Sequence, residues 1–125
     1  MSNLKPNTGL NENAPILVQS SSKAVIHAPV EKIDIPEWLF TLTDAEYQHC
    51  SSAHIAGGAT RTPDGKRISI NVEMAGPSLL VQHWTDEIAE KQNCRLVSLS
   101  DMFAQQERTK VQLTWDMTVK PLSER

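Results

Sequence analysis

Two stretches of strict alternation constrain the fold of this chain more than any other feature. In residues 66–74, Lys-Arg-Ile-Ser-Ile-Asn-Val-Glu-Met, every second residue from Ile68 onward is apolar, and residues 109–120 show the same pattern from Val111 onward. Successive side chains of a strand point to opposite faces of a sheet, so a period of two predicts a half-buried strand. Both segments are therefore predicted as strands of an antiparallel sheet that has one apolar and one polar face.

Residues 62–65, Thr-Pro-Asp-Gly, stand just before the first of these stretches. Proline presets one torsion angle of a turn, and Asp-Gly tolerates the positive φ angles of a tight hairpin. Residues 53–62 are therefore predicted to pair with residues 66–75. With the other β-rich runs that end at turn residues, we expect about six strands, at residues 23–28, 53–62, 66–75, 79–90, 93–103 and 109–120.

Two short helices are predicted between the first and the second strand. Pro36 suits the first turn of a helix, and apolar residues follow it at helical spacing. Thr43-Asp-Ala-Glu46 is a capping box, in which each of the two end side chains accepts a hydrogen bond from the backbone amide of the other residue. This order predicts an α+β fold, with a curved antiparallel sheet of about six strands and two short helices after strand one.

Composition places the chain among single-domain globular proteins. It has 125 residues, of which 39% are hydrophobic and 22% are charged, and we expect a flexible tail at residues 1–20 followed by one domain at residues 21–122. No apolar run approaches the roughly twenty residues of a membrane span, and a net charge of −3 without a basic block argues against a nucleic-acid partner. The amino terminus shows no export or transit signal, so a cytoplasmic protein with reduced cysteines is expected.

Two segments of the chain resemble a known family. Residues 24–32, Ala-Val-Ile-His-Ala-Pro-Val-Glu-Lys, lead into Glu37-Trp38-Leu39, and this resembles the start of the START-like, or helix-grip, superfamily, which includes polyketide cyclases and birch-pollen-allergen proteins. Residues 109–121 are similar to the last strand of that superfamily, in which a T-x-V-x-W-x pattern recurs. The resemblance implies a curved sheet that forms a cavity for a small hydrophobic ligand.

One departure from the superfamily pattern bears on the expected partners. Members usually continue after the last strand into a long carboxy-terminal helix that closes the ligand cavity, whereas only Leu-Ser-Glu-Arg follows Pro121 here. Leaving the apolar face of the sheet in water would cost many kcal/mol, against a total stability of about 5 to 15 kcal/mol. We therefore expect the two helices or a second subunit to cover that face, with a homodimer as the expected assembly.

Three functions stay open on the sequence alone. The resemblance favours a noncatalytic protein that binds a small hydrophobic ligand and needs no metal or other cofactor. The alternatives are an enzyme of the polyketide cyclase or dehydratase kind, in which a few polar groups move protons, and a homodimeric interaction protein without a pocket. No catalytic residue is identified, and Glu73 is expected on a solvated face. The ligand-binding residues implied by the resemblance are Tyr47, His54, Ile70, Val72, His83 and Trp115.

Residues 48–58, Gln-His-Cys-Ser-Ser-Ala-His-Ile-Ala-Gly-Gly, contain one of the two cysteines and two of the four histidines. If the second helix persists to His54, then Tyr47, Cys50 and His54 share one helix face. If the helix ends near Cys50, a strand begins at residue 53, and the Gly57-Gly58 pair marks a bulge or bend. The predicted hairpin favours the second alternative, and the chain has neither a C-x-x-C nor an H-x-x-x-H pair that would indicate a zinc site.

Overall fold

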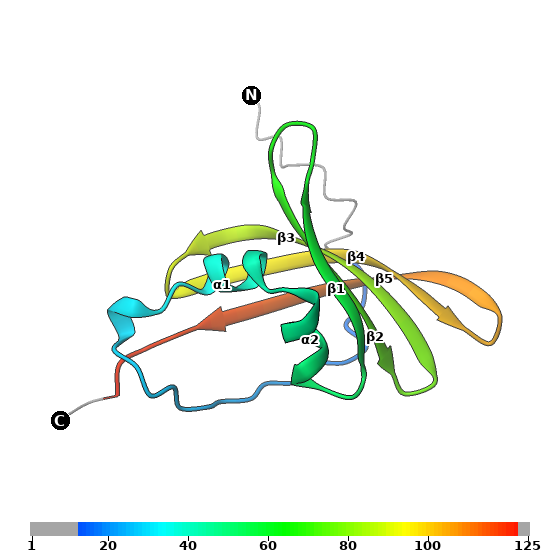
Figure 1. The fold of residues 1–125 in the computed structure, drawn as a ribbon. Helices are drawn as coiled ribbons and strands as arrows, with labels where there is room; N and C mark the ends of the chain where they lie inside the picture. The colour runs from blue at the N-terminus through cyan, green and yellow to red at the C-terminus, as the bar shows by residue number, and fades with distance from the viewer. Residues whose placement is uncertain (1–12, 123–125) are drawn as a thin grey trace.

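The computed structural model describes residues 13–122, and five strands form one antiparallel sheet in it (Figure 1). Each strand pairs with the next one in the chain, so the sheet is a meander in the order β1-β2-β3-β4-β5. Short turns join consecutive strands, as antiparallel pairing allows. The strands span His54–Arg61 (β1), Arg67–Ala75 (β2), Ser78–Glu90 (β3), Asn93–Ala104 (β4) and Glu107–Thr118 (β5).

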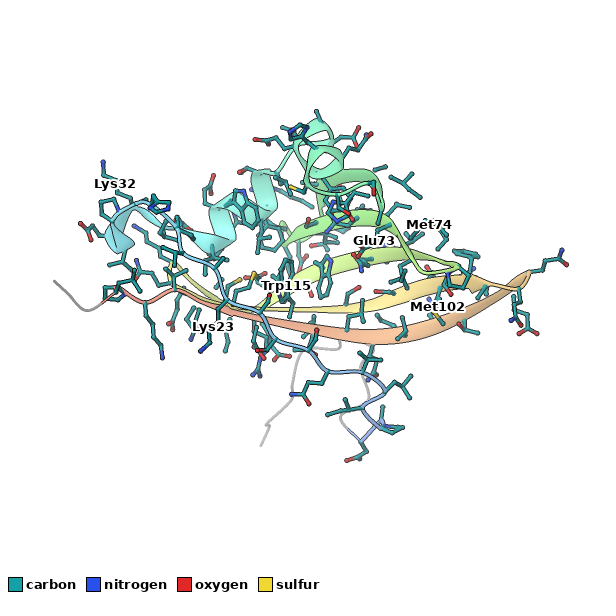
Figure 2. All side chains as sticks on the ribbon, turned by 90° about the horizontal axis from the view of Figure 1, so that it is seen from below. Lys23, Lys32, Glu73, Met74, Met102 and Trp115 are labelled. Carbon is teal, nitrogen blue, oxygen red and sulfur yellow. The ribbon has the colours of Figure 1, made fainter. Side chains whose placement is uncertain are left out.

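The helices precede the sheet in the chain and lie together on one of its faces (Figure 2). A 3₁₀ turn, η1 (Val30–Lys32), is followed by α1 (Ile35–Thr41) and α2 (Asp44–Cys50). We call the face under the helices the helix-side face and the opposite one the outer face. The strand register assigns residues to each face, because directly paired residues share a face and neighbours alternate. The helix-side face carries Ser69, Asn71, Glu73, Gln82, Trp84, Leu113 and Trp115, and the outer face carries Ile70, Val72, Val81, His83, Asp101 and Lys110.

The α+β class, the antiparallel sheet and the two helices agree with the sequence prediction, but the predicted six strands are wrong. Residues 23–28 form no strand, so the sheet has five strands and the helices come before all of them rather than after strand one. Val25 and Ile26 are 60% and 55% exposed, and the Ala28 amide bonds the Ile26 carbonyl in a local turn. A β-branched run forms a strand only when it pairs with a neighbouring strand. Residues 24–28 lie beside residues 118–122, but they pair with no strand among the described residues.

The sequence predictions were most accurate where the residues formed a recognisable turn or helix-capping motif. Both hydrogen bonds of the Thr43–Glu46 capping box are present at the start of α2, and α2 ends at Cys50, as the second of the two alternatives predicted. The predicted hairpin also forms, with Gly65 at a φ of 89° in its turn. Of the predicted tail at residues 1–20, residues 1–12 lie outside the described residues, and residues 13–20 form no helix or strand.

The hydrophobic core lies between α1 and the helix-side face of the central strands. Asp34 caps α1 by accepting a hydrogen bond from the Glu37 amide, and Pro36 stands in the first turn. This start turns the apolar side of a seven-residue helix toward the sheet. The core residues are Ile35, Leu39 and Phe40 of α1 and Trp84, Cys94 and Leu96 of the sheet. No helix in the described part of the chain is long and apolar enough to cross a membrane.

Charged side chains cluster around Asp101 on the outer face. Its carboxylate lies 3.1 Å from Arg108 Nε and 3.1 Å from Lys110 Nζ, and His83 Nε2 lies 3.7 Å away. Hydrogen bonding from Lys110 and then from Arg108 lowers the pKa of Asp101 below its ordinary value of 3.8. The folded state therefore favours the charged carboxylate.

We expect Asp101→Asn to lower the melting temperature at pH 7. A lowered pKa in the folded state stabilises the fold above the unfolded value, and this contribution is lost as the pH falls through the folded value. The difference from the wild-type protein should therefore shrink only below the ordinary value of 3.8. Thermal unfolding between pH 2.5 and 7 measures this, with Glu90→Gln as a control because Glu90 makes no ion pair with a described residue. A difference that stays constant down to pH 2.5 would refute the assignment.

Candidate functional site

A cavity of about 340 Å³ lies on the helix-side face, beside α2. One lining residue comes from α2 and the others come from four strands, β1, β2, β3 and β5. Figure 2 shows two of them, Glu73 and Trp115, on the side of the sheet that carries the helices. The lining residues are Tyr47, His54, Asn71, Glu73, Gln82, Trp84, Leu113 and Trp115.

A stacked pair of rings from α2 and β1 forms one wall. The rings of Tyr47 and His54 are parallel to within 1°, with their centroids 3.8 Å apart. His54 Nδ1 lies 2.6 Å from the backbone carbonyl oxygen of Tyr47. Because a carbonyl oxygen only accepts hydrogen bonds, Nδ1 carries the hydrogen and donates it. The ring of His54 is thus held in one orientation, with Nε2 3.6 Å from Glu73 Oε2.

A β-bulge directs His54 toward this cavity. The register of β1 with β2 shifts between His54 and Ala56, so that His54 pairs with Glu73 and Ala56 pairs with Val72. Without the extra residue, strict alternation from Ala56 would place His54 on the outer face. Bulges often redirect a side chain next to a functional site. The sequence analysis expected a bulge or bend at the Gly57-Gly58 pair, whereas the register shift lies just before that pair, between His54 and Ala56.

A chain of hydrogen bonds fixes the Glu73 carboxylate. Gln82 Nε2 donates to Glu73 Oε1 at 2.8 Å, and Trp84 Nε1 donates to Gln82 Oε1 at 3.3 Å. The indole can only donate, so it sets which end of the Gln82 amide faces Glu73. The carboxylate therefore presents Oε2 to His54, while Oε1 is already bonded.

The hydroxyl of Tyr47 is buried and makes no hydrogen bond within the described part of the chain. The residue is only 5% exposed. Burial raises the pKa of Tyr47, and the negative charge of Glu73 and the nearby Cys50 raise this pKa further. Tyr47 is therefore a neutral phenol at physiological pH, and a buried hydroxyl without a partner costs about 1–3 kcal/mol.

Gly57 of β1 explains how α2 comes so close to the sheet. A Cβ atom at this position would lie 3.0 Å from Tyr47 Cγ and Cδ2, a closer contact than nine in ten that Cβ atoms make in proteins. The Gly57 amide also donates to Asp44 Oδ1 at 2.8 Å, which ties the first turn of α2 to β1. Hydrogen bonds from Gln48 and from this amide lower the pKa of Asp44. The role of Gly57 is thus to leave room for the Tyr47 ring.

Apolar side chains make the opposite wall of the cavity. The indole rings of Trp84 and Trp115 have centroids 6.1 Å apart and are tilted by 54°, and Leu113 lies on the same strand as Trp115. Trp84 is buried, whereas Trp115 is 43% exposed. Aromatic walls with a few oriented polar groups are typical of small-molecule sites.

The structure brings together three of the six residues that the sequence implied for ligand binding. Tyr47, His54 and Trp115 line the cavity. The other three, Ile70, Val72 and His83, lie on the outer face, because Ile70 pairs with His83 and Val72 with Val81 while the alternate residues face the helices. The alternation in β2 marks two faces but does not reveal which of them the helices cover.

The sequence reasoning missed several polar residues of the site. Glu73 was expected in solvent, yet its carboxylate bonds Gln82 and lies near His54, and Asn71 beside it also lines the cavity. The available signal was the polar side of the alternation in β2, where Asn71 and Glu73 lie, together with Gln82 of β3, which pairs with Asn71. Polar residues in register on two adjacent strands indicate a shared polar surface, but not that a helix lies over it.

Within residues 13–122, the structure has neither a disulfide nor a cluster of side chains that could hold a metal ion. Cys50 is exposed and Cys94 is buried, and neither forms a disulfide. Cys50 Sγ donates to the carbonyl oxygen of Glu46. Among residues 13–122, no group of three or more His, Cys, Asp or Glu side chains is arranged to hold a metal ion.

Comparisons of the chain with protein-family models, with curated proteins and with solved structures found no match.

We expect Gly57→Ala to disturb the site, because the added methyl group requires the Tyr47 ring to move. The same change at Gly58 is the matched control, since no atom lies within 4 Å of a Cβ there. Gly57→Ala should lower the unfolding free energy by about 1–3 kcal/mol, the usual cost of overpacking, and shift the NMR signals of the His54 ring. Gly58→Ala should leave those signals in place. Equal effects of the two substitutions would contradict the close contact between Gly57 and Tyr47.

Proposed function

We propose that this protein binds a small, largely hydrophobic molecule in the cavity on the helix-side face and does so without catalysing a reaction. The observation that carries the proposal is the buried, unpartnered hydroxyl of Tyr47, a residue that lines that cavity. Buried polar groups normally have partners, and exceptions call for an explanation. A bound molecule that accepts this hydrogen bond supplies one.

The size and the chemistry of the cavity support the proposal. Small-molecule sites have volumes of about 300 to 1,000 Å³ and combine apolar walls with a few oriented polar groups. The cavity has a volume of about 340 Å³, with two tryptophans and a leucine on one side and His54, Glu73 and Gln82 on the other. Its dimensions suit a molecule of one or two rings.

The START-like resemblance and a cytoplasmic location are part of the same proposal. A sheet whose one face carries two short helices and a cavity agrees with a helix-grip arrangement in outline, although the strand expected at residues 23–28 is missing. Cys50 is an exposed thiol without a disulfide, which favours a reducing compartment.

An enzyme of the cyclase or dehydratase kind is the second candidate function. The observation in its favour is His54, whose Nε2 faces both the cavity and the Glu73 carboxylate while Nδ1 is held by the backbone. A histidine oriented in this way is suited to accept or donate a proton. Binding ranks first because none of the lining residues is an evident nucleophile with an adjacent base.

We expect the neutral fluorescent probe N-phenyl-1-naphthylamine to bind with a one-to-one stoichiometry and to gain fluorescence. Asn71→Trp should abolish this binding, because the larger side chain fills the cavity from β2. His83→Trp is the control, since it adds the same indole on the outer face, where His83 is exposed. Probe titration with both variants tests the proposal. Saturable binding that Asn71→Trp leaves unchanged would place the probe elsewhere and remove the support for this cavity.

We also propose that two copies of the chain pair through β5. This strand ends the sheet and pairs only with β4 among the described strands. Antiparallel pairing of β5 with a second copy, centred on Leu113, places Lys110 opposite the partner's Asp116 and Val111 opposite the partner's Trp115. Opposite charges and apolar pairs at directly facing positions both stabilise a sheet, and the arrangement has the two-fold symmetry of a homodimer.

Sedimentation velocity should therefore show a dimer at micromolar concentration. Replacing Val111 with Pro should weaken the dimer, because proline cannot join a sheet ladder, whereas the same replacement at Gln19, which lies outside every helix and strand, should not. Circular dichroism confirms that each variant is folded. A wild-type protein that sediments as a monomer at all concentrations would overturn the pairing and leave the ligand-binding proposal standing.

A further inference from the structure

Three residues that line the cavity each carry a polar atom without a well-formed hydrogen bond to the described part of the chain. Tyr47 Oη is a donor with no acceptor. His54 Nε2 and Glu73 Oε2 lie 3.6 Å apart, which exceeds the 2.7–3.2 Å of an N–H···O hydrogen bond. The pattern of these atoms, and not only the volume of the cavity, limits what can bind.

The tautomer of His54 determines what the pair with Glu73 requires. Because Nδ1 holds the hydrogen that bonds the Tyr47 carbonyl, a neutral His54 ring has a lone pair at Nε2. That lone pair then faces an oxygen of a carboxylate, which is also an acceptor. Two acceptors that face each other repel, and one additional N–H or O–H donor beside them removes the conflict. With the ring neutral, the pair is a receptor for a hydrogen-bond donor.

Tyr47 requires a hydrogen-bond acceptor in the ligand. Its raised pKa keeps the phenol protonated, so its hydroxyl offers a hydrogen to an acceptor. The hydroxyl is shielded from solvent, so a ligand bound here requires a lining side chain to shift. Trp115 is the one exposed side chain of the lining, and so it has the least packing to lose. A ligand that satisfies both sides carries a donor and an acceptor close together.

The charge and the shape of the cavity lining narrow the class of ligand further. The lining contains a carboxylate but no Lys or Arg, so an anionic ligand would be repelled by Glu73 without compensation. The tilted indoles of Trp84 and Trp115 and the stacked Tyr47–His54 pair offer flat apolar surfaces. Aromatic rings pack well against such surfaces in stacked or tilted arrangements.

We propose that the cavity selects neutral, flat ring compounds that present an N–H and an adjacent carbonyl on one edge, as a cyclic cis-amide (lactam) does. The N–H bonds Glu73 and His54, and the carbonyl accepts the hydrogen bond of Tyr47. This inference rests on the proposed binding function and names the ligand class for the same cavity.

The test uses 2-quinolinone as the probe, with two relatives of similar size. N-methyl-2-quinolinone lacks the donor, and 2-naphthoate is an anion. By calorimetric titration, 2-quinolinone should bind with a one-to-one stoichiometry. N-methyl-2-quinolinone should bind at least about tenfold more weakly, because the missing donor leaves a polar group of the site unpaired. The anion 2-naphthoate should not bind measurably, because Glu73 repels it. Equal affinity for 2-quinolinone and its N-methyl derivative would overturn the ligand class.

Tyr47→Phe provides a second and independent test. It should weaken the binding of 2-quinolinone by about tenfold, which corresponds to about 1.4 kcal/mol, yet leave the melting temperature of the ligand-free protein unchanged or higher, because it removes a buried hydroxyl without a partner. His83→Phe on the outer face is the control and should not change the affinity. A variant that loses stability and binds 2-quinolinone normally would show that the hydroxyl has a structural partner instead.

The outcomes separate this inference from the proposed function. If N-phenyl-1-naphthylamine binds in the cavity but the two quinolinones bind equally, the ligand class is wrong and the binding function stands. If neither that probe nor 2-quinolinone binds, the binding function itself fails, and the ligand class fails with it.

Discussion

The close contact between Gly57 and Tyr47 is the constraint on which the rest of the site depends. A side chain at position 57 would press on the Tyr47 ring, so glycine leaves the room that the ring occupies on β1. The bond from the Gly57 amide to Asp44 fixes the first turn of α2 above that strand. The capping box begins α2 at Asp44, so Tyr47 comes one turn into the helix. The chain then reverses within three residues, and His54 returns to stack on the same ring. The position of one helix thus brings two site residues together.

This packing has an energetic consequence on the helix-side face. Strands β2 and β3 turn polar residues toward the helices, and burying such groups is costly unless each finds a hydrogen bond. Most do, because Gln82 bonds both Glu73 and Trp84. Ser98 bonds Ser100 and the His83 amide. The core beside α1 supplies the apolar contribution, with Trp84 shared between the core and the cavity. The fold therefore combines an apolar half under α1 with a polar half under α2.

The sequence predicted the features that depend on residues close together in the chain, and it missed those that depend on residues far apart in the chain. The hairpin turn at Asp64-Gly65, the capping box at Thr43 and the end of α2 at Cys50 depend on neighbours in the chain, and the structure has all three. Which face of β2 the helices cover depends on residues far apart in the chain, so the alternation alone misplaced Ile70 and Val72 relative to the cavity. The bulge before Ala56 is also decided by tertiary packing, and it turns His54 inward. The segment 23–28 has strand composition but pairs with no strand within residues 13–122.

The hydroxyl of Tyr47 differs from the other buried polar groups in a way that a purely structural role does not explain. If α2 needed only an aromatic ring over Gly57, phenylalanine would fill the same volume without an unpaired donor. Loose polar packing is not the general condition of this face either, because Gln82, Ser98 and Ser100 are buried beside it with their hydrogen bonds made. Natural sequences that violate a local rule tend to do so at functional sites. In this chain the violation coincides with the aromatic cavity and with the two facing acceptors of His54 and Glu73, and this coincidence makes the end of the cavity near Tyr47 the part of the protein most suited to recognise another molecule.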